Sequence, residues 1–179
     1  CGIICIRDQT KRGYDLISVH KFSKNIHSGE IPAFLIYKMT IKDDMQEVIN
    51  LYKKFDRYKD NTDEELYQHI LPSFKLKQYK IHKDGDNVIA FTNWAFLNKE
   101  AEKKYMKTAK IDAADWNSGN RLWHIDTICT KNLMKVHRWT KEYFTKLLGQ
   151  NKFINWLRVK PDGKIYRKTK IRTKESWDQ

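Results

Sequence analysis

A strand, a helix and a second strand follow one another near the end of this chain, and this succession constrains the fold more than any other feature. Residues 121–129 and 153–159 are rich in β-prone side chains, whereas residues 133–148 carry apolar side chains at helical spacing and end before Gly149. Two strands joined by a helix predict a crossover connection within one sheet. We therefore expect a sheet with at least one helix packed against it.

Turn signals on both sides of this unit predict antiparallel hairpins. The first is Asp-Gly-Asp-Asn at 84–87, and the second is Pro-Asp-Gly at 161–163. Two amphipathic helices come earlier in the chain, one from about residue 40 and one that is capped by Thr62 with Glu65 and ended by Pro72. The predicted fold class is α+β, or α/β, in which helices flank a central, mostly antiparallel sheet.

The regular pattern begins close to residue 39. Residues 1–38 are mixed and turn-rich, so we expect them to form an N-terminal arm or an appended segment. Residues 39–170 form the expected principal domain, and residues 171–179 a basic C-terminal tail. A length of 179 residues fits one such domain.

The charge balance predicts an acidic partner. Lys and Arg outnumber Asp and Glu by 35 to 22, which gives a net charge of +13. Nucleic acid, an acidic carrier protein, a phosphorylated cofactor and an anionic membrane surface all fit this charge, and composition alone does not choose among them.

The three cysteines and the hydropathy indicate the compartment. Cys1, Cys5 and Cys129 form no pair or cluster with the spacing of a zinc site or a disulfide framework, so we expect no metal. No stretch approaches the roughly 20 apolar residues of a transmembrane segment, and no signal peptide is evident. These features predict a soluble, cytoplasmic protein.

Residues 93–126 have the composition of a functional site. This run holds three tryptophans, a Ser-Gly turn and a His-x-Asp sequence, which are Trp94, Trp116, Trp123, Ser118-Gly119 and His124 with Asp126. Each tryptophan by itself is more simply a core residue. The turn offers free backbone N–H groups that could orient the loop or bind an oxyanion, although a plain turn is the simpler explanation.

The order of these residues resembles the RTX toxin-activating lysine acyltransferase family. The matching positions are Leu71-Pro72, Gln78-Tyr79, Asp84-Gly85, Ile89-Ala90-Phe91, Trp94-Ala95, Glu102, Tyr105, Asp115-Trp116, Ser118-Gly119, Leu122-Trp123, Ile125-Asp126-Thr127-Ile128, Arg158-Val159, Pro161 and Gly163-Lys164. The resemblance covers residues 71 to about 165, roughly half of the chain.

The resemblance implies a fold similar to the GNAT acetyltransferases and transfer of a fatty acyl group from acyl carrier protein to a protein lysine. The implied partners are acyl carrier protein and a protein substrate, with no bound cofactor and with acyl-acyl carrier protein as the donor. The family is also compatible with a homodimer. Its chemistry is carried by a histidine in the N-terminal helical region and by an aspartate, which corresponds to Asp126 here.

The sequence departs from the family at two places. The family's histidine lies about fourteen residues before the proline that matches Pro72, and counting back without gaps leads to Tyr58. Residues 129–131 replace an Ala-Pro-Phe segment. His124 lies two residues before Asp126, so on a regular strand both side chains would share a face and form an acid/base pair, with Tyr58 as a third polar group. The alternative is that His124 is a core histidine.

The other histidines are weaker candidates. His69 lies on the inward stripe of its helix and is expected to be a satisfied core residue, whereas His82 and His137 are expected at the surface. His20 and His27 lie outside the matched region.

Two functional hypotheses remain. The first is an acyltransferase that uses Asp126, His124 and Tyr58 for catalysis and binds substrate through Trp94, Trp116, Ser118, Gly119 and Trp123. The second is a catalytically inactive GNAT-like module, for example of a phage or another mobile element, that binds an acidic partner or nucleic acid.

Overall fold

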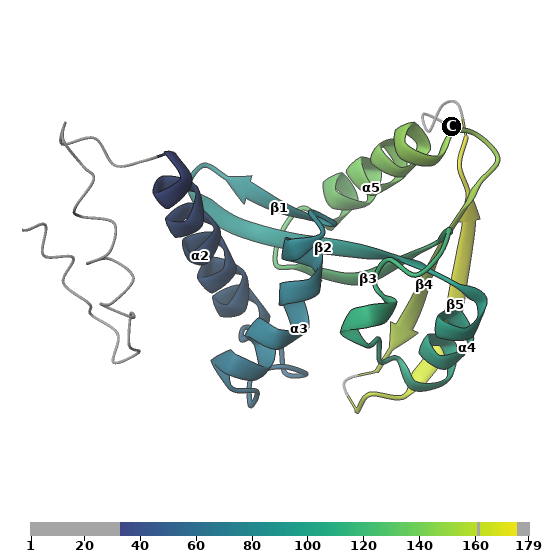
Figure 1. Cartoon of the computed structure of the whole chain (residues 1–179), viewed down its shortest axis with the longest axis horizontal. Helices are drawn as coiled ribbons and strands as arrows, with labels where there is room; N and C mark the ends of the chain where they lie inside the picture. The colour runs from purple at the N-terminus through teal and green to yellow at the C-terminus, as the bar shows by residue number, and fades with distance from the viewer. Residues whose placement is uncertain (1–32, 161, 175–179) are drawn as a thin grey trace, which may run out of the picture. The chain divides into compact units, whose positions relative to one another are not determined.

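The computed structural model describes residues 33–160 and 162–174, and for residues 33–39 only the backbone. The elements are α2 (Ala33–Tyr52), α3 (Asp63–Lys75), β1 (Tyr79–Asp84), β2 (Asn87–Leu97), α4 (Lys99–Thr108), the 3₁₀ turn η2 (Ala113–Asp115), β3 (Arg121–Cys129), α5 (Leu133–Leu148), β4 (Phe153–Val159) and β5 (Ile165–Arg172) (Figure 1). The chain divides into two compact units, Cys1–Ile41 and Lys42–Gln179. All five strands belong to the second unit. The expected arm up to residue 32 and the expected tail from residue 175 lie outside the described residues.

The five strands form one sheet in the order β1-β2-β3-β4-β5. Every neighbouring pair is antiparallel except β3 and β4, which are parallel as the crossover through α5 requires. The predicted α+β class and mostly antiparallel sheet are confirmed, and the arrangement is consistent with a GNAT-like fold.

The parallel pair is short. Only Trp123 with Asn155 and His124 with Trp156 pair across β3 and β4. Beyond these residues the two strands separate toward their C-terminal ends (Figure 1). A sheet that opens in this way exposes the sides of both strands inside the domain, where a ligand can enter.

Helices cover the two faces of the sheet. On one face α4 packs its Ala101 and Tyr105 against Ala95 and Trp123. On the other face α5 packs its Phe144 against Trp94, Leu122 and Ile154. Figure 1 shows α5 on one side of the sheet and α3 and α4 on the other. Both faces of the central strand β3 are therefore buried, and the side chain at each β3 position belongs to one layer or the other.

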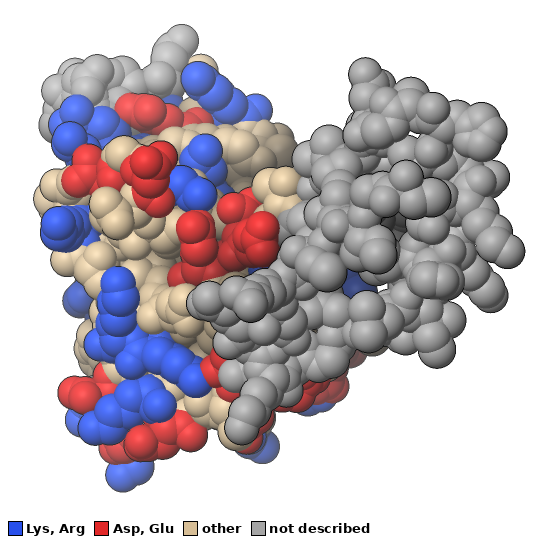
Figure 2. Space-filling view, turned by 90° about the vertical axis from the view of Figure 1, so that its left-hand side faces the viewer, with Lys and Arg blue, Asp and Glu red and all other residues tan. Residues whose placement is uncertain are grey.

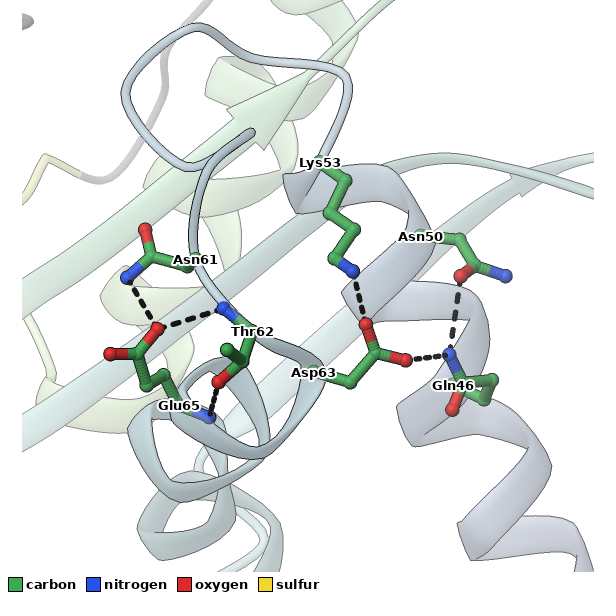
Figure 3. A network of polar contacts seen from close by, with 7 residues as sticks. All are labelled: Gln46, Asn50, Lys53, Asn61, Thr62, Asp63 and Glu65. Carbon is green, nitrogen blue, oxygen red and sulfur yellow. Dashed lines mark hydrogen bonds and ion pairs between the residues drawn. The ribbon is translucent and has the colours of Figure 1, made fainter. Parts of the chain in front are cut away.

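A polar network fixes the start of α3 (Figure 3). The Thr62 hydroxyl accepts a hydrogen bond from the Glu65 N–H at 3.1 Å, and the Glu65 carboxylate accepts one from the Thr62 N–H at 2.7 Å, so the predicted capping box is confirmed. The Asp63 carboxylate pairs with Lys53 and accepts a hydrogen bond from Gln46 at 3.3 Å. These contacts join α3 to the end of α2.

Pro72 does not end α3, contrary to the prediction. The helix continues to Lys75, and the N–H of Leu76 donates to the Pro72 carbonyl at 3.1 Å. Proline removes one intrahelical hydrogen bond and crowds the carbonyl four residues before it, but its own carbonyl still accepts a hydrogen bond, so the last turn can form after it. Residues 73–75 thus extend α3 beyond the turn that carries His69.

Candidate active site

Asp126 lies at the centre of a buried polar cluster that is built from three elements. It belongs to β3, and its side chain is 9% exposed. The Nε2 atom of His69, on α3, lies 2.9 Å from Asp126 Oδ2. The Asn93 side chain, on β2, donates from Nδ2 to the same carboxylate oxygen at 3.2 Å and accepts from the Asp126 N–H at 2.8 Å. These contacts hold the carboxylate in one orientation.

Two tyrosines complete the cluster. The Tyr58 hydroxyl lies 3.5 Å from Asp126 Oδ1. Tyr52, at the end of α2, is fully buried, and its ring meets the rings of Tyr58 and His69 edge-on at 4.9 and 5.8 Å. Burial and then the Asp126 charge raise the pKa of Tyr58 above its usual value, so the phenol keeps its proton and remains a donor.

The electrostatics favour an ionised carboxylate beside a basic imidazole. Burial raises the pKa of Asp126, but the charge of His69 and the hydrogen bonds from its neighbours outweigh burial and lower it to about 2. Burial likewise lowers the pKa of His69, and the Asp126 carboxylate more than offsets this, so the net pKa is raised. A histidine with a raised pKa, oriented by a carboxylate, is a suitable general base.

His124 does not share the face of Asp126, so that prediction is wrong. In the β2–β3 register Trp94 lies opposite His124 and Asn93 lies opposite Asp126, which leaves Ile125 as an extra residue in β3. This β-bulge shifts the alternation of side chains by one position. His124 therefore points toward α5, where its ring meets Phe144 edge-on at 5.7 Å.

The surroundings of His124 are those of a core residue. Its side chain is 5% exposed, and the Thr127 hydroxyl lies 3.4 Å from Nε2. Burial lowers the pKa of His124 to about 4, so the ring is neutral at physiological pH. The structure thus agrees with the alternative interpretation, a core histidine.

His69, in contrast, is the histidine that meets Asp126, although the sequence suggested a satisfied core residue. Its side chain is 36% exposed, so it is only partly buried. Counting without gaps leads to Tyr58, and both side chains reach the same carboxylate, Tyr58 from the segment between α2 and α3 and His69 from α3 itself. The inward position of His69, three residues before Pro72, was the available signal, but it did not indicate which residue His69 would face.

A cavity of about 640 Å³ opens beside the His69–Asp126 pair. It lies where β3 and β4 separate, and its walls include Tyr58, Tyr105, Ile111, Leu157 and Val159. The polar part of the wall carries the pair, and the apolar part includes Ile125 and Ile128 of β3 with Leu157 and Val159 of β4. A volume of this order is typical of small-molecule sites.

Comparison with known proteins assigns the family. The profile of the RTX toxin acyltransferase family matches residues 39–173. The chain belongs to this family.

Relatives with assigned names include three toxin-activating or protein-lysine acyltransferases. The leukotoxin-activating lysine-acyltransferase LktC of a Pasteurella haemolytica-like species (strain 5943B) is 28% identical over 113 residues, 58% of this chain and 68% of that protein. The RTX-I toxin-activating lysine-acyltransferase ApxIC of Actinobacillus pleuropneumoniae is 34% identical over 98 residues, 54% of each chain. The protein-lysine myristoyltransferase HlyC of Escherichia coli is 38% identical over 60 residues, 33% of this chain and 35% of that protein. The matched segments thus span from about a third to about two thirds of these relatives.

In this family member, the tryptophans of the 93–126 run are core residues. Trp116 is 1% exposed and Trp123 is not exposed, and both pack with α4. Trp94 is 3% exposed and packs on Phe144 of α5 at 5.3 Å. Among the described residues that line the cavity beside Asp126, none of the three appears. The prediction that they contact substrate has no support from this geometry.

The Ser118-Gly119 turn is likewise occupied by backbone contacts. The Ser118 hydroxyl accepts from the Asn98 N–H at 3.0 Å, and the Gly119 N–H donates to the Phe96 carbonyl at 3.1 Å. A Cβ atom on Gly119 would lie 2.5 Å from the Leu97 carbonyl oxygen. The turn therefore anchors the loop against β2, and glycine is required because the two backbones approach so closely.

Neither a metal centre nor a membrane span is found in the described part of the chain. Across residues 33–160 and 162–174, His, Cys, Asp and Glu side chains form no group of three that could hold a metal ion. No helix in these ranges is long and apolar enough to cross a membrane.

Proposed function

We propose that this protein is a protein-lysine acyltransferase in which His69 and Asp126 promote the attack of a lysine amine on an acyl thioester. The observation that carries the proposal is the 2.9 Å contact between His69 Nε2 and Asp126 Oδ2 at the wall of the cavity between β3 and β4. Family membership and the names of the relatives support the same reaction.

The contact supports different roles for the two ring nitrogens of His69. Because the Asp126 carboxylate can only accept, a neutral His69 keeps its proton on Nε2, and Nδ1 is left as the acceptor. Nδ1 then takes a proton from the lysine amine as the amine nitrogen bonds to the thioester carbonyl carbon. The C–S bond breaks, the amide forms, and the departing thiolate is protonated by the imidazolium. Asp126 stabilises the imidazolium that exists between these steps.

The donor that fits best is an acyl carrier protein in the cytoplasm. Such carriers are acidic, and the net charge of +13 favours encounter with an acidic protein. The apolar side chains of the cavity wall, which include Ile128, Leu157 and Val159, suit a fatty acyl chain. No bound cofactor is needed because the donor brings its own thioester.

The alternative of a catalytically inactive binding module loses its main argument. That hypothesis depended on a missing histidine near Tyr58, and His69 occupies the place beside Asp126 that the reaction needs. We therefore do not favour it.

The proposal is tested by incubating the protein with acyl carrier protein that bears a labelled acyl chain and with a protein that carries acceptor lysines, followed by mass spectrometry. We expect label in amide linkage to lysine, and loss of most label with His69→Gln or Asp126→Asn. His137→Gln is the matched control, because His137 lies on α5 outside the cavity. Equal labelling by all three variants would overturn the assignment of the pair.

A further inference from the structure

A second cavity, of about 540 Å³, lies beside the first residues of β3 and β4, whereas Asp126 lies in the second half of β3. It is bounded by α4 and by the starts of β3 and β4, with the end of β5 along one side. Its lining includes Glu102, Arg121, Lys152, Phe153, Lys168 and Lys170. We refer to it as the basic groove.

The cations of the basic groove exceed its carboxylates. Glu102 is the acidic residue in the lining, and it is already engaged, because it pairs with Arg121 Nε at 3.2 Å and accepts from Trp123 Nε1 at 3.0 Å. Within the described residues, Lys152, Lys168 and Lys170 make no ion pair. Three positive charges are therefore available to an external anion.

Aromatic rings hold two of these cations in place. Lys168 Nζ lies 5.0 Å from the centre of the Trp123 ring, and Lys170 Nζ lies 3.5 Å from that of Phe153. Phe153 is 39% exposed, so it adds an apolar surface beside the charges. A ring supports a cation without neutralising it, which leaves the charge free for a carboxylate.

Positive charge does not dominate every face of the molecule. On the face shown in Figure 2, Lys and Arg side chains are interspersed with Asp and Glu side chains. Residues 163–174, which include all of β5, contain no Asp or Glu but hold Lys164, Arg167, Lys168, Lys170, Arg172 and Lys174. The sheet edge at β5 is thus basic, and the basic groove is a cavity in this region.

The basic groove and the active cavity are joined along α4. Glu102 of α4 lines the groove, and Tyr105 and Ala109 line the active cavity. Trp123 lies under α4 on the same face of the sheet. Seven helical residues from Glu102 to Ala109 span roughly 10 Å. An extended peptide covers that distance with about three residues.

We propose that the basic groove binds an acidic segment of the acceptor protein close to the lysine that is acylated. This inference rests on the proposed function, since it concerns the acceptor of that reaction. An acidic segment fits because the groove offers about three free cations beside one exposed ring in a small hollow, whereas nucleic acid or a folded carrier needs a broader surface. The spacing along α4 places the acidic residues about three to five positions from the target lysine.

The experiment compares two lysine peptides that differ only at the position four residues from the lysine, which is Glu in one and Gln in the other. The double variant Lys168→Glu/Lys170→Glu is compared with Lys131→Glu/Lys135→Glu, a pair of exposed lysines outside the groove with the same change of charge. We expect the groove variant to raise KM for the Glu peptide about tenfold and to leave kcat unchanged. The control variant and the KM for the acyl donor should change little.

Binding of a fluorescent Glu peptide is measured in parallel by anisotropy, which needs no turnover. Equal KM values for the Glu and Gln peptides with wild-type protein would overturn the inference, as would a rise in donor KM, which would assign the groove to the carrier. Displacement of the peptide by oligonucleotide, with nucleic-acid affinity lost in the groove variant, would also overturn it. Groove-dependent peptide binding without any acylation would refute the proposed function and leave the acidic-segment site intact.

Discussion

The coupling of Asp126 to its neighbours predicts how the acid stability of the protein changes when the carboxylate is removed. The pKa of Asp126 is lowered from 3.8 to about 2 in the folded protein, with the side chain 9% exposed. Each pH unit of difference corresponds to about 1.4 kcal/mol, so the net interaction amounts to about 2 kcal/mol. Because the folded pKa is depressed, this stability is present above pH ~4 and is lost as the pH falls toward 2.

Asp126→Asn should therefore make the free energy of unfolding less sensitive to acid. The free energy of unfolding, measured by urea denaturation at intervals from pH 2 to 7, should fall less steeply with acid in the variant, by about 2 kcal/mol across this window. Asp56→Asn is the control, since the Asp56 side chain is 87% exposed, and its curve should run parallel to that of the wild type. Parallel curves for Asp126→Asn as well would refute the coupling.

The same pair also makes the free energy of unfolding depend on pH near neutrality, through His69. Its pKa is raised in the folded state, so its contribution is present below pH ~6.5 and is lost as the pH rises through the folded pKa. An NMR titration of the ring should show a lower pKa for His69 in Asp126→Asn, because the carboxylate no longer favours the imidazolium. An unchanged or higher pKa would contradict the assignment of Asp126 as its partner.

Three further predictions concern activity and stability. Tyr58→Phe should lower kcat less than tenfold, because the hydroxyl contact of 3.5 Å with Asp126 is weak, and a loss as large as that of His69→Gln in the same acylation assay would contradict this. Gly119→Ala should lower the free energy of unfolding by about 2 kcal/mol, since a Cβ would clash with the Leu97 backbone, and an unchanged urea midpoint would count against the packing described. Thr62→Ala should cost about 1 kcal/mol through the lost cap of α3, whereas Thr62→Ser should retain most of the stability in the same urea titration.

Local patterns predicted much of the fold because each depends on residues close together in the chain. The capping box at Thr62 and the C-terminal glycine of α5, Gly149 at φ 80°, were both predicted and are present. The turn before β2 contains Gly85 at φ 57°, a conformation that favours glycine. The crossover between β3 and β4 followed from the same local evidence.

The active site could not be predicted in the same way. His69 and Asp126 are 57 residues apart in sequence, and their contact depends on how α3 packs on the sheet. The error over His124 has a different cause, because strand periodicity assumes that every residue has a partner across the ladder. Ile125 has none, and no turn residue or glycine marks the bulge in the sequence.

The bulge at Ile125 also determines which kinds of genetic change this strand can tolerate. Loss of Ile125 would make His124 and Asp126 consecutive residues of a regular strand, and consecutive side chains point to opposite faces, so the carboxylate would keep its side of the sheet. A single-codon deletion at the bulge should therefore disturb the two layers less than a deletion within the regularly paired part of β3.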